Sequence, residues 1–362
     1  MYTYTIRGWR YPAFAVLALF MATLLVACGG PDGSNPPAAT PAAVRVNGFG
    51  TAANHVHALL ALPQHVLILA THYGLFRSED AGSTWQEVAG GSHQLMDGLM
   101  SYALAASPLN GQRIYVLTQP SVSHYPGTPG LYTSADQGRT WKLSSATAQL
   151  TSGGIFTEAA GNDTPDEVYI YLPALGALGL RVSMDAGVHF SMAGTLPFGR
   201  IDGVLPIPGA PGHLLAYGSN GMASSSNGGT NWQVIQGLNG GIFSTATAGP
   251  HSPIYASGDA GIFVSSDGGK TFKPVNAGSS FASLCVSPMQ PRIVYGKTGL
   301  LVYRSTDGGH TWKALPQIKG NLASLAADPA NATDLYLSLS YPSAIYRLQG
   351  DSPTWQSLTP AP

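Results

Sequence analysis

The sequence predicts an all-β protein, a seven-bladed β-propeller of four-stranded antiparallel blades, and three observations support this. Charged residues make up 10% of the 362 residues, and Glu and Lys, which favour long solvated helices, are scarce. The 45 glycines and 27 prolines indicate many turns, while 44% hydrophobic residues suffice for a core. An aromatic residue that follows a polar turn returns every 40 to 56 residues, which is propeller spacing. These aromatic residues are Trp85, Trp141, Phe190, Trp232, Phe272, Trp312 and Trp355.

The first repeat shows the strand order of a blade. Residues 55–62 predict the inner strand, 65–70 the second, 74–78 the third and 84–88 the outer one. In the last repeat, residues 354–358 are the candidate outer strand. Either this segment completes blade 7 alone, or residues 43–49 pair there and close the ring; pairing of both termini would remove exposed sheet edges.

The polar turn motif reads Ser-x-Asp-x-Gly-x-Thr-Trp. Copies at 78–85, 134–141, 265–272 and 305–312 are nearly intact, those at 183–190 and 225–232 are altered, and one at 354–355 is degraded. The motif is identified as the Asp-box or BNR repeat, and residues 44–362 resemble the BNR-repeat β-propellers, which include sialidases, xyloglucanases, the sortilin ectodomain and photosystem II assembly factors. The resemblance is specific for fold, but the fold hosts both enzymes and binding scaffolds.

The acidic residues of the motif are expected to be structural. A carboxylate at this position can accept backbone N–H groups, and the glycine two residues later supplies a positive φ. We therefore assign a turn-stabilising role, and neither catalysis nor calcium binding, to Asp80, Asp136, Asp185, Asn227, Asp267 and Asp307.

The N-terminus predicts an export signal. Arg7 and Arg10 precede an apolar run at 11–27, and the segment Leu-Val-Ala-Cys-Gly at 25–29 resembles the bacterial lipobox. This predicts a lipoprotein signal peptide at 1–27, a lipidated Cys28 and a flexible Gly/Pro/Ser/Ala-rich tether at 28–43. The protein is then expected in the cell envelope, extracytoplasmic and lipid-anchored to a membrane. The alternative is an ordinary secretory signal or an uncleaved anchor.

Strand order separates the acidic residues between the two faces of a propeller. Loops that join strands 3 and 4 carry the Asp boxes, and loops that join strands 1 and 2 lie on the same face. The 1–2 loops contain Asp163, Asp166, Glu167, Asp328 and Asp334. The family resemblance implies that propeller enzymes work at the opposite face, around the axis. That face retains Asp97, Asp202, Asp259 and, less directly, Glu158. A glycosidase needs two carboxylates across the scissile bond, so the supply is small.

The arginines argue against a typical sialidase. The resemblance implies an arginine triad for such an enzyme, but most arginines here adjoin Asp boxes or 1–2 loops. Only Arg200, and less directly Arg45, can reach the opposite face.

A histidine group marks the same opposite face. His55 and His57 alternate along the inner strand of blade 1, and His72-Tyr73 lies in the neighbouring 2–3 loop. This segment resembles bacterial BNR-repeat lipoproteins described as glycosyl hydrolases, although Ala58 replaces the glycine usual there. Three histidines can bind a transition metal, hold another ligand, act as acid or base, or simply pack at the channel wall. Nearby candidates for extending the site are His93, His124, Tyr125 and Tyr341.

The functional prediction is a binding or assembly module that acts through its axial face, as a monomer and without a cofactor. The net charge of −1 and the 17 basic residues argue against a nucleic-acid partner. The candidate ligand face comprises His55, His57, His72, Tyr73, Asp97, Arg200, Asp202 and Asp259. The alternative is a glycoside hydrolase that uses Asp97, Asp202 or Asp259 on extracellular glycans. The partner, protein or glycan, stays open.

Overall fold

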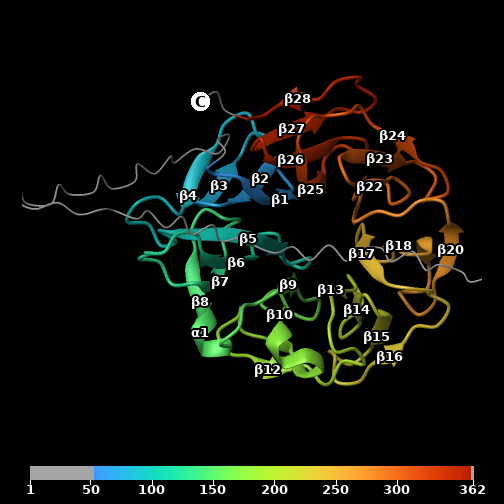
Figure 1. Cartoon of the computed structure of the whole chain (residues 1–362), viewed down its shortest axis with the longest axis horizontal. Coiled ribbons are helices and arrows are strands. Elements are labelled where there is room, and N and C mark those ends of the chain that lie inside the picture. Colours follow the sequence, from blue (N-terminus) through green and yellow to red (C-terminus); the bar gives the residue numbers. More distant parts are fainter. Residues whose placement is uncertain (1–52, 360–362) are drawn as a thin grey trace, which may run out of the picture. The chain divides into compact units, whose positions relative to one another are not determined.

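The structure is a computed structural model that describes residues 53–359. Within these residues the chain forms seven four-stranded antiparallel sheets arranged around an axis, and the seven-bladed propeller is confirmed (Figure 1). Each sheet takes four strands that are consecutive in the sequence, with the first strand innermost.

The first four blades contain strands β1 to β16. Blade 1 consists of β1 (Val56–Leu62), β2 (Val66–Thr71), β3 (Gly74–Ser78) and β4 (Gln86–Ala89). Blade 2 consists of β5 (Leu99–Ala106), β6 (Ile114–Pro120), β7 (Gly130–Ser134) and β8 (Lys142–Ala146). Blade 3 consists of β9 (Thr157–Ala160), β10 (Val168–Tyr171), β11 (Leu180–Ser183) and β12 (Ser191–Met192). Blade 4 consists of β13 (Gly203–Pro206), β14 (Leu214–Gly218), β15 (Gly221–Ser225) and β16 (Gln233–Val234).

The last three blades contain strands β17 to β28. Blade 5 consists of β17 (Ile242–Thr247), β18 (Ile254–Gly258), β19 (Gly261–Ser265) and β20 (Lys273–Asn276). Blade 6 consists of β21 (Ser283–Val286), β22 (Val294–Thr298), β23 (Leu301–Ser305) and β24 (Lys313–Ala314). Blade 7 consists of β25 (Asn321–Ala327), β26 (Leu335–Tyr341), β27 (Ala344–Leu348) and β28 (Gln356–Ser357). The helical elements of the described chain are the short helix α1 (Thr147–Leu150) and the 3₁₀ helix η1 (Pro173–Leu178).

The outer strands begin later than predicted. In blade 1 the sequence predicts residues 84–88, whereas β4 begins at Gln86. The reason is that the backbone N–H and the hydroxyl of Thr84 both donate to the Asp80 carboxylate, so Thr84 belongs to the turn. The third strand matches its predicted bounds, and the two inner strands are each displaced by about one residue at one or both ends.

Blade 7 is completed by its own last segment. In β28, Gln356 pairs with Arg347 and Ser357 with Tyr346 of β27. The alternative strand at residues 43–49 lies outside the described residues. Side chains join blade 7 to blade 1: Trp85 Nε1 donates to the Leu358 carbonyl at 3.1 Å, and Ser343 Oγ donates to the Asn54 carbonyl at 2.9 Å.

The core lies between adjacent blades rather than within one of them. One cluster packs Ile68 and Leu75 of blade 1 against Val116 and Tyr132 of blade 2. Strands β2 and β6 are buried over most of their length because both faces of a middle strand are covered by neighbouring blades. The result is a continuous ring of apolar contacts that holds the loops of each face in fixed positions.

Five middle strands share a buried tyrosine that the repeat motif does not include. These are Tyr115, Tyr169, Tyr255, Tyr295 and Tyr336. The hydroxyls of Tyr115 and Tyr255 donate to the carbonyls of Pro165 and Pro291, in the next blade's 1–2 loop. The signal in the sequence that indicates them is an apolar-Tyr pair that recurs at the start of these five second strands.

None of the helices in the described part of the chain has the length and apolar character needed to cross a membrane.

Candidate ligand-binding face

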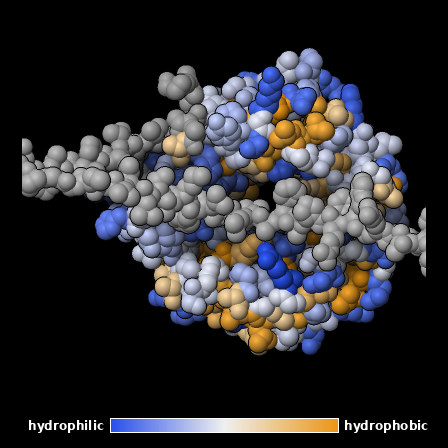
Figure 2. Space-filling model, viewed as in Figure 1, coloured by the Kyte–Doolittle hydropathy of each residue, from blue (hydrophilic) through white to orange (hydrophobic). Residues whose placement is uncertain are grey.

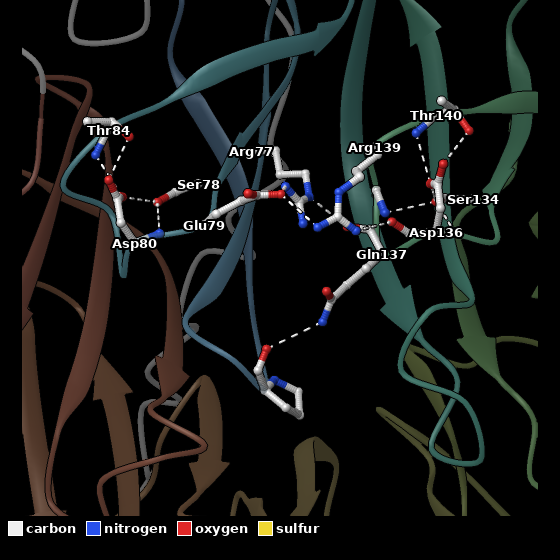
Figure 3. A network of polar contacts seen from close by, with 12 residues as sticks. Arg77, Ser78, Glu79, Asp80, Thr84, Ser134, Asp136, Gln137, Arg139 and Thr140 are labelled. Carbon is white, nitrogen blue, oxygen red and sulfur yellow. Dashed lines mark hydrogen bonds and ion pairs between the residues drawn. The ribbon is translucent and has the colours of Figure 1, made fainter.

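The Asp boxes form closed hydrogen-bonded turns on one face of the propeller. In blade 1, Ser78 Oγ donates to Asp80 Oδ1 at 2.8 Å and accepts the Gly82 N–H at 2.8 Å. Asp80 Oδ1 also accepts the Thr84 N–H at 2.8 Å, and Oδ2 accepts the Thr84 hydroxyl at 2.6 Å (Figure 3). Gly82 adopts a φ of 90°, which favours glycine. Every carboxylate oxygen of this turn therefore has a partner within the turn.

The same pattern recurs at Asp136, Asp267 and Asp307. Partial burial by itself would raise the pKa of Asp267, but the hydrogen bonds from Thr271 and Ser265 outweigh it and hold the pKa at about 2. The pKa of Asp307 is about 2 for the corresponding reasons. Carboxylates held in this way stay charged at neutral pH, and their oxygens are occupied by hydrogen bonds within the turn. They are therefore poor general acids.

The two altered boxes keep the turn but change its donors. Asp185 accepts the His189 N–H and lies 2.6 Å from His189 Nδ1, which takes the place of the threonine hydroxyl. In the fourth box, Asn227 Oδ1 accepts the N–H of Asn231 and the hydroxyl of Ser225. In this blade the buried Trp232 Nε1 has no hydrogen-bond partner.

Arginines on the Asp-box face are used in contacts between and within blades. Arg77 Nε donates to the Gln137 carbonyl at 2.8 Å, and Arg139 lies 2.8 Å from Glu79 Oε1, so that blades 1 and 2 are joined (Figure 3). Further pairs are Arg113–Asp166, Arg304–Asp351 and Arg347 with Asp328 and Asp334. These arginines do not reach the opposite face.

The acidic residues of the opposite face mostly order its loops. Asp97 is buried and its Oδ2 accepts the His93 N–H at 2.9 Å. Asp259 Oδ2 accepts the Gly241 N–H at 2.6 Å. Asp202 is more exposed and lies 3.9 Å from Arg200. These three carboxylates come from separate loops, and each already has a local partner.

Glu158 differs from these three acids. It lies on β9, the inner strand of blade 3, and both carboxylate oxygens are buried without a hydrogen-bond partner. Burial raises its pKa well above the usual value, which favours the protonated carboxyl group. Burial also raises the pKa of the neighbouring Tyr102, whose hydroxyl donates to the Ile155 carbonyl at 2.7 Å.

The structure brings His55, His57 and His72 together. The ring centroid of His55 lies 4.6 Å from that of His57 and 4.7 Å from that of His72, and the rings of His55 and His72 are stacked. One ligand nitrogen can be chosen on each ring such that all three lie within 4.8 Å of one another. Tyr73 meets the His72 ring edge-on at a centroid distance of 4.8 Å. Each of the three histidine rings is half-buried.

The backbone around the cluster is held by Asn54, which no sequence motif indicates. Its Oδ1 accepts the Tyr73 N–H at 2.9 Å, and its carbonyl accepts the Ser343 hydroxyl from blade 7. The His72 N–H donates to the His55 carbonyl at 2.9 Å. These bonds fix the 2–3 loop of blade 1 against the start of β1.

Burial keeps the cluster neutral. Desolvation, with smaller contributions from the charges of His55 and His72, lowers the pKa of His57 to about 4. Desolvation also lowers the pKa of His55 and His72. The buried nitrogens His57 Nε2 and His72 Nδ1 have no hydrogen-bond partner. The cluster thus presents unprotonated imidazole lone pairs at neutral pH.

The other predicted residues do not join this group. Within the described residues, the cluster of metal-capable side chains contains the three histidines alone, without His93 or His124. Tyr341 is exposed at the end of β26 in blade 7, and Arg200 stacks over Phe156 at 5.4 Å. Cys28 and Arg45 lie outside the described residues.

In the described part of the chain, the surface shows no second cluster of histidines or other metal-capable side chains. On the face drawn in Figure 2, the hydrophobic residues shown in colour form separate groups between hydrophilic ones. A groove of about 610 Å³ lies between blades 4 and 5 on the Asp-box face, lined by residues that include 231–236 and 268–271. It holds no cluster of titratable groups comparable to the histidines.

Comparison with known proteins supports the architecture. The BNR/Asp-box repeat model matches residues 303–314, which is the sixth box with its flanking strand residues. The chain is a seven-bladed BNR-repeat β-propeller. A xyloglucanase of Acetivibrio thermocellus is 23% identical over 304 residues, covering 66% of this propeller chain and 35% of the enzyme.

Solved structures of two kinds share the fold. The GH74 xyloglucanase from Xanthomonas campestris aligns with a TM-score of 0.64 at 17% identity, over 87% of this propeller chain and 55% of the enzyme. YCF48 from Cyanidioschyzon merolae aligns with a TM-score of 0.57 at 15% identity, over 81% of this propeller chain and 94% of YCF48. The propeller therefore spans about a third to a half of the xyloglucanases but nearly the whole of YCF48.

Proposed function

We propose that this propeller is an extracytoplasmic, lipid-anchored binding or assembly module whose ligand docks on the axial face around His55, His57, His72 and Tyr73. The observation that carries the proposal is the pair of buried imidazole nitrogens, His57 Nε2 and His72 Nδ1, that lack a partner. A buried polar atom without a hydrogen bond costs about 1–3 kcal/mol, and a ligand that reaches it removes this cost.

The acids of the same face support binding rather than hydrolysis. A glycosidase needs two carboxylates that flank one bond, roughly 5–10 Å apart, with different protonation states. Asp97 and Asp259 instead accept backbone N–H groups of their own loops, and Asp202 pairs with Arg200. Asp97 and Asp259 thus stabilise their own loops, and Asp202 is held only by an exposed ion pair.

A neighbour of the same fold supports a binding function. One YCF48 structure that shares the propeller fold is described as bound to D1 peptide. A propeller of this kind can therefore serve as a peptide-binding scaffold, although the identities show the fold alone.

Photo-crosslinking in intact cells tests the binding face while the partner is still unidentified. Benzoylphenylalanine is placed at Tyr73, in the 2–3 loop of blade 1, or at Tyr341, the last residue of β26, and at Met184 in the third Asp box as a matched exposed control. We expect adducts of higher mass from the first two positions and none from Met184. Adducts from Met184 alone, or from no position, would overturn the proposal.

The lipid anchor is tested separately at Cys28. The Leu-Val-Ala-Cys segment supports lipidation of this thiol, so a Cys28→Ala chain should lose incorporation of an alkyne fatty acid and leave the membrane fraction. Equal labelling of both chains would contradict the anchor and leave the axial-face proposal standing.

The second candidate function is a glycoside hydrolase, which the 23% identity to a xyloglucanase favours. Incubation of the purified chain with xyloglucan and other β-glucans should release no reducing sugar. If sugar is released, and if release is abolished by Asp97→Asn, Asp202→Asn, Asp259→Asn or Glu158→Gln, the protein is an enzyme and the binding proposal is wrong.

A further inference from the structure

The histidine cluster has the composition of a metal site. Imidazole nitrogen suits zinc, copper, nickel and iron, and three protein nitrogens with one open position form a known zinc arrangement. Here His55 directly precedes β1, His57 lies in it and His72 lies in the adjacent 2–3 loop, and the chosen nitrogens lie within 4.8 Å of one another. Nitrogens bound to one tetrahedral ion at 2.0–2.1 Å are roughly 3.4 Å apart, so ring displacements of about an ångström suffice.

A β-bulge places the central ligand. The β1–β2 register shifts between Val56 and Ala58, which leaves His57 as the extra residue. The same shift occurs at Tyr102 in β5 and at Phe243 in β17, so the bulge is a recurring feature of the inner strands. Bulges re-aim a side chain next to functional sites. In blade 1 the re-aimed residue is a histidine that lies 4.6 Å from His55.

The surroundings suit an uncharged cluster that can accept a cation. In the described residues, the cluster contains the three imidazoles and no acid whose negative charge would balance a protonated ring. Metal-ligating histidines usually donate their second ring N–H to a carbonyl or carboxylate. For His72 the backbone of Ser121 is such a partner, because the His72 ring forms a hydrogen bond with it.

We propose that His55, His57 and His72 form a three-histidine site for one divalent zinc or copper ion, with the remaining coordination position open toward the axial mouth. The inference rests on the proposed function, because it names the chemistry by which that face binds. The ion satisfies the buried lone pairs of His57 and His72 and gives the face a positive centre that an anionic or donor atom of a ligand can reach.

Metal binding is measured on the full chain purified in detergent without a histidine tag and stripped with a chelator. Zinc and copper are titrated separately against a chromophoric chelator, and bound metal is counted by elemental analysis. We expect one ion per chain. His57→Ala and His72→Gln should each weaken binding at least tenfold, whereas His310→Ala, which removes an exposed histidine from the sixth Asp box, should not.

The copper-loaded chain adds a spectroscopic readout. Its electron paramagnetic resonance spectrum should show nitrogen hyperfine structure that weakens in His57→Ala. Unfolding curves of the stripped variants establish that each is folded. Binding well below one ion per chain, or binding equal in His57→Ala and His310→Ala, overturns the metal site.

The two proposals fail in different ways. If the chain binds no metal while Tyr73 still forms adducts in cells, the metal site is wrong and the docking face stands. If the chain binds one ion through the three histidines while neither Tyr73 nor Tyr341 forms adducts, the site binds metal and the assembly function is wrong.

Discussion

The two faces of the propeller use polar residues in opposite ways. On the Asp-box face, the Asp80 carboxylate accepts from Ser78 and twice from Thr84, all within one turn. On the axial face, His57 and His72 are equally fixed by their strand and loop, yet each has a buried nitrogen without a hydrogen-bond partner. A polar group that is fully bonded in place stabilises the fold, whereas one that is held but unbonded favours a ligand. The Asp80 turn and the histidine cluster therefore differ in hydrogen-bond satisfaction, although the fold holds the side chains of both in place.

The largest expected effect is at the buried ion cluster of blade 7. Arg347 lies 2.9 Å from both Asp328 and Asp334, which are nearly buried. Arg347→Met leaves two unpaired carboxylates and should destabilise the protein by about 3–5 kcal/mol, measured by chemical denaturation. Arg200→Met, at an exposed arginine of the axial face, should change stability by less than about 0.5 kcal/mol. Similar losses in both variants would remove the contrast between the faces.

A single Asp box should have an intermediate effect. Asp307→Ala removes the acceptor of the Thr311 N–H, the Thr311 hydroxyl and the Ser305 hydroxyl, and should cost about 1–3 kcal/mol. Asp307→Asn keeps one acceptor oxygen, as Asn227 does in blade 4, and should cost less. A denaturation midpoint unchanged by Asp307→Ala would show that the box is not a stabilising turn.

Acid titration should separate the two faces by pH. The folded pKa of Asp267 and Asp307 is about 2, below the usual 3.8, so their contribution is present above about pH 4 and is lost as pH falls toward 2. The folded pKa of His57 is about 4, below the usual 6.5, so the unfolded chain binds more protons and stability falls from pH 6.5 to 4.

Unfolding midpoints measured from about pH 8 to about pH 2 should show both windows. His57→Phe should flatten the upper window only, and Asp307→Asn should reduce the lower one only. A loss of the upper window in Asp307→Asn would contradict this assignment.

The smallest expected effect on stability is at the histidine cluster. His57→Phe at about pH 7.5 replaces a half-buried ring with an unpartnered nitrogen by an apolar ring of similar size, which is nearly neutral or slightly stabilising. The change in unfolding free energy should stay within about 0.5 kcal/mol, while zinc or copper binding is lost. A loss above about 2 kcal/mol would instead show that the cluster is wall packing.

The fold could be predicted because each repeat of the sequence corresponds to one blade. Each box places a turn, a glycine of positive φ and an aromatic residue at fixed spacing, and seven copies determine blade number and strand order. The sequence also predicts that His55, His57 and His72 lie near one another, but not that His55 precedes β1 and that a β-bulge places His57. The sequence could not reveal that Asp97 and Asp259 accept N–H groups of residues 4 and 18 positions away. Such bonds depend on loop conformation, which no periodic pattern specifies.

Two further residues escaped prediction for the same reason. Asn54 has no motif around it, and its role follows only from the contacts that it makes with Tyr73 and with blade 7. The sequence assigns Glu158 to the face opposite the Asp boxes, but not to β9, and its burial depends on the packing of neighbouring inner strands.

The junction between blades 7 and 1 has a mechanical consequence. No strand is shared across it in the described residues; it is held by side-chain contacts, including those of Trp85 with Leu358 and Ser343 with Asn54. Asn54 connects this junction to the histidine cluster. Its carbonyl accepts the Ser343 hydroxyl of blade 7, and its Oδ1 accepts the Tyr73 N–H. Separation of blades 7 and 1 would therefore also release the loop of His72 and Tyr73, so that closure of the ring and the geometry of the histidine cluster are coupled.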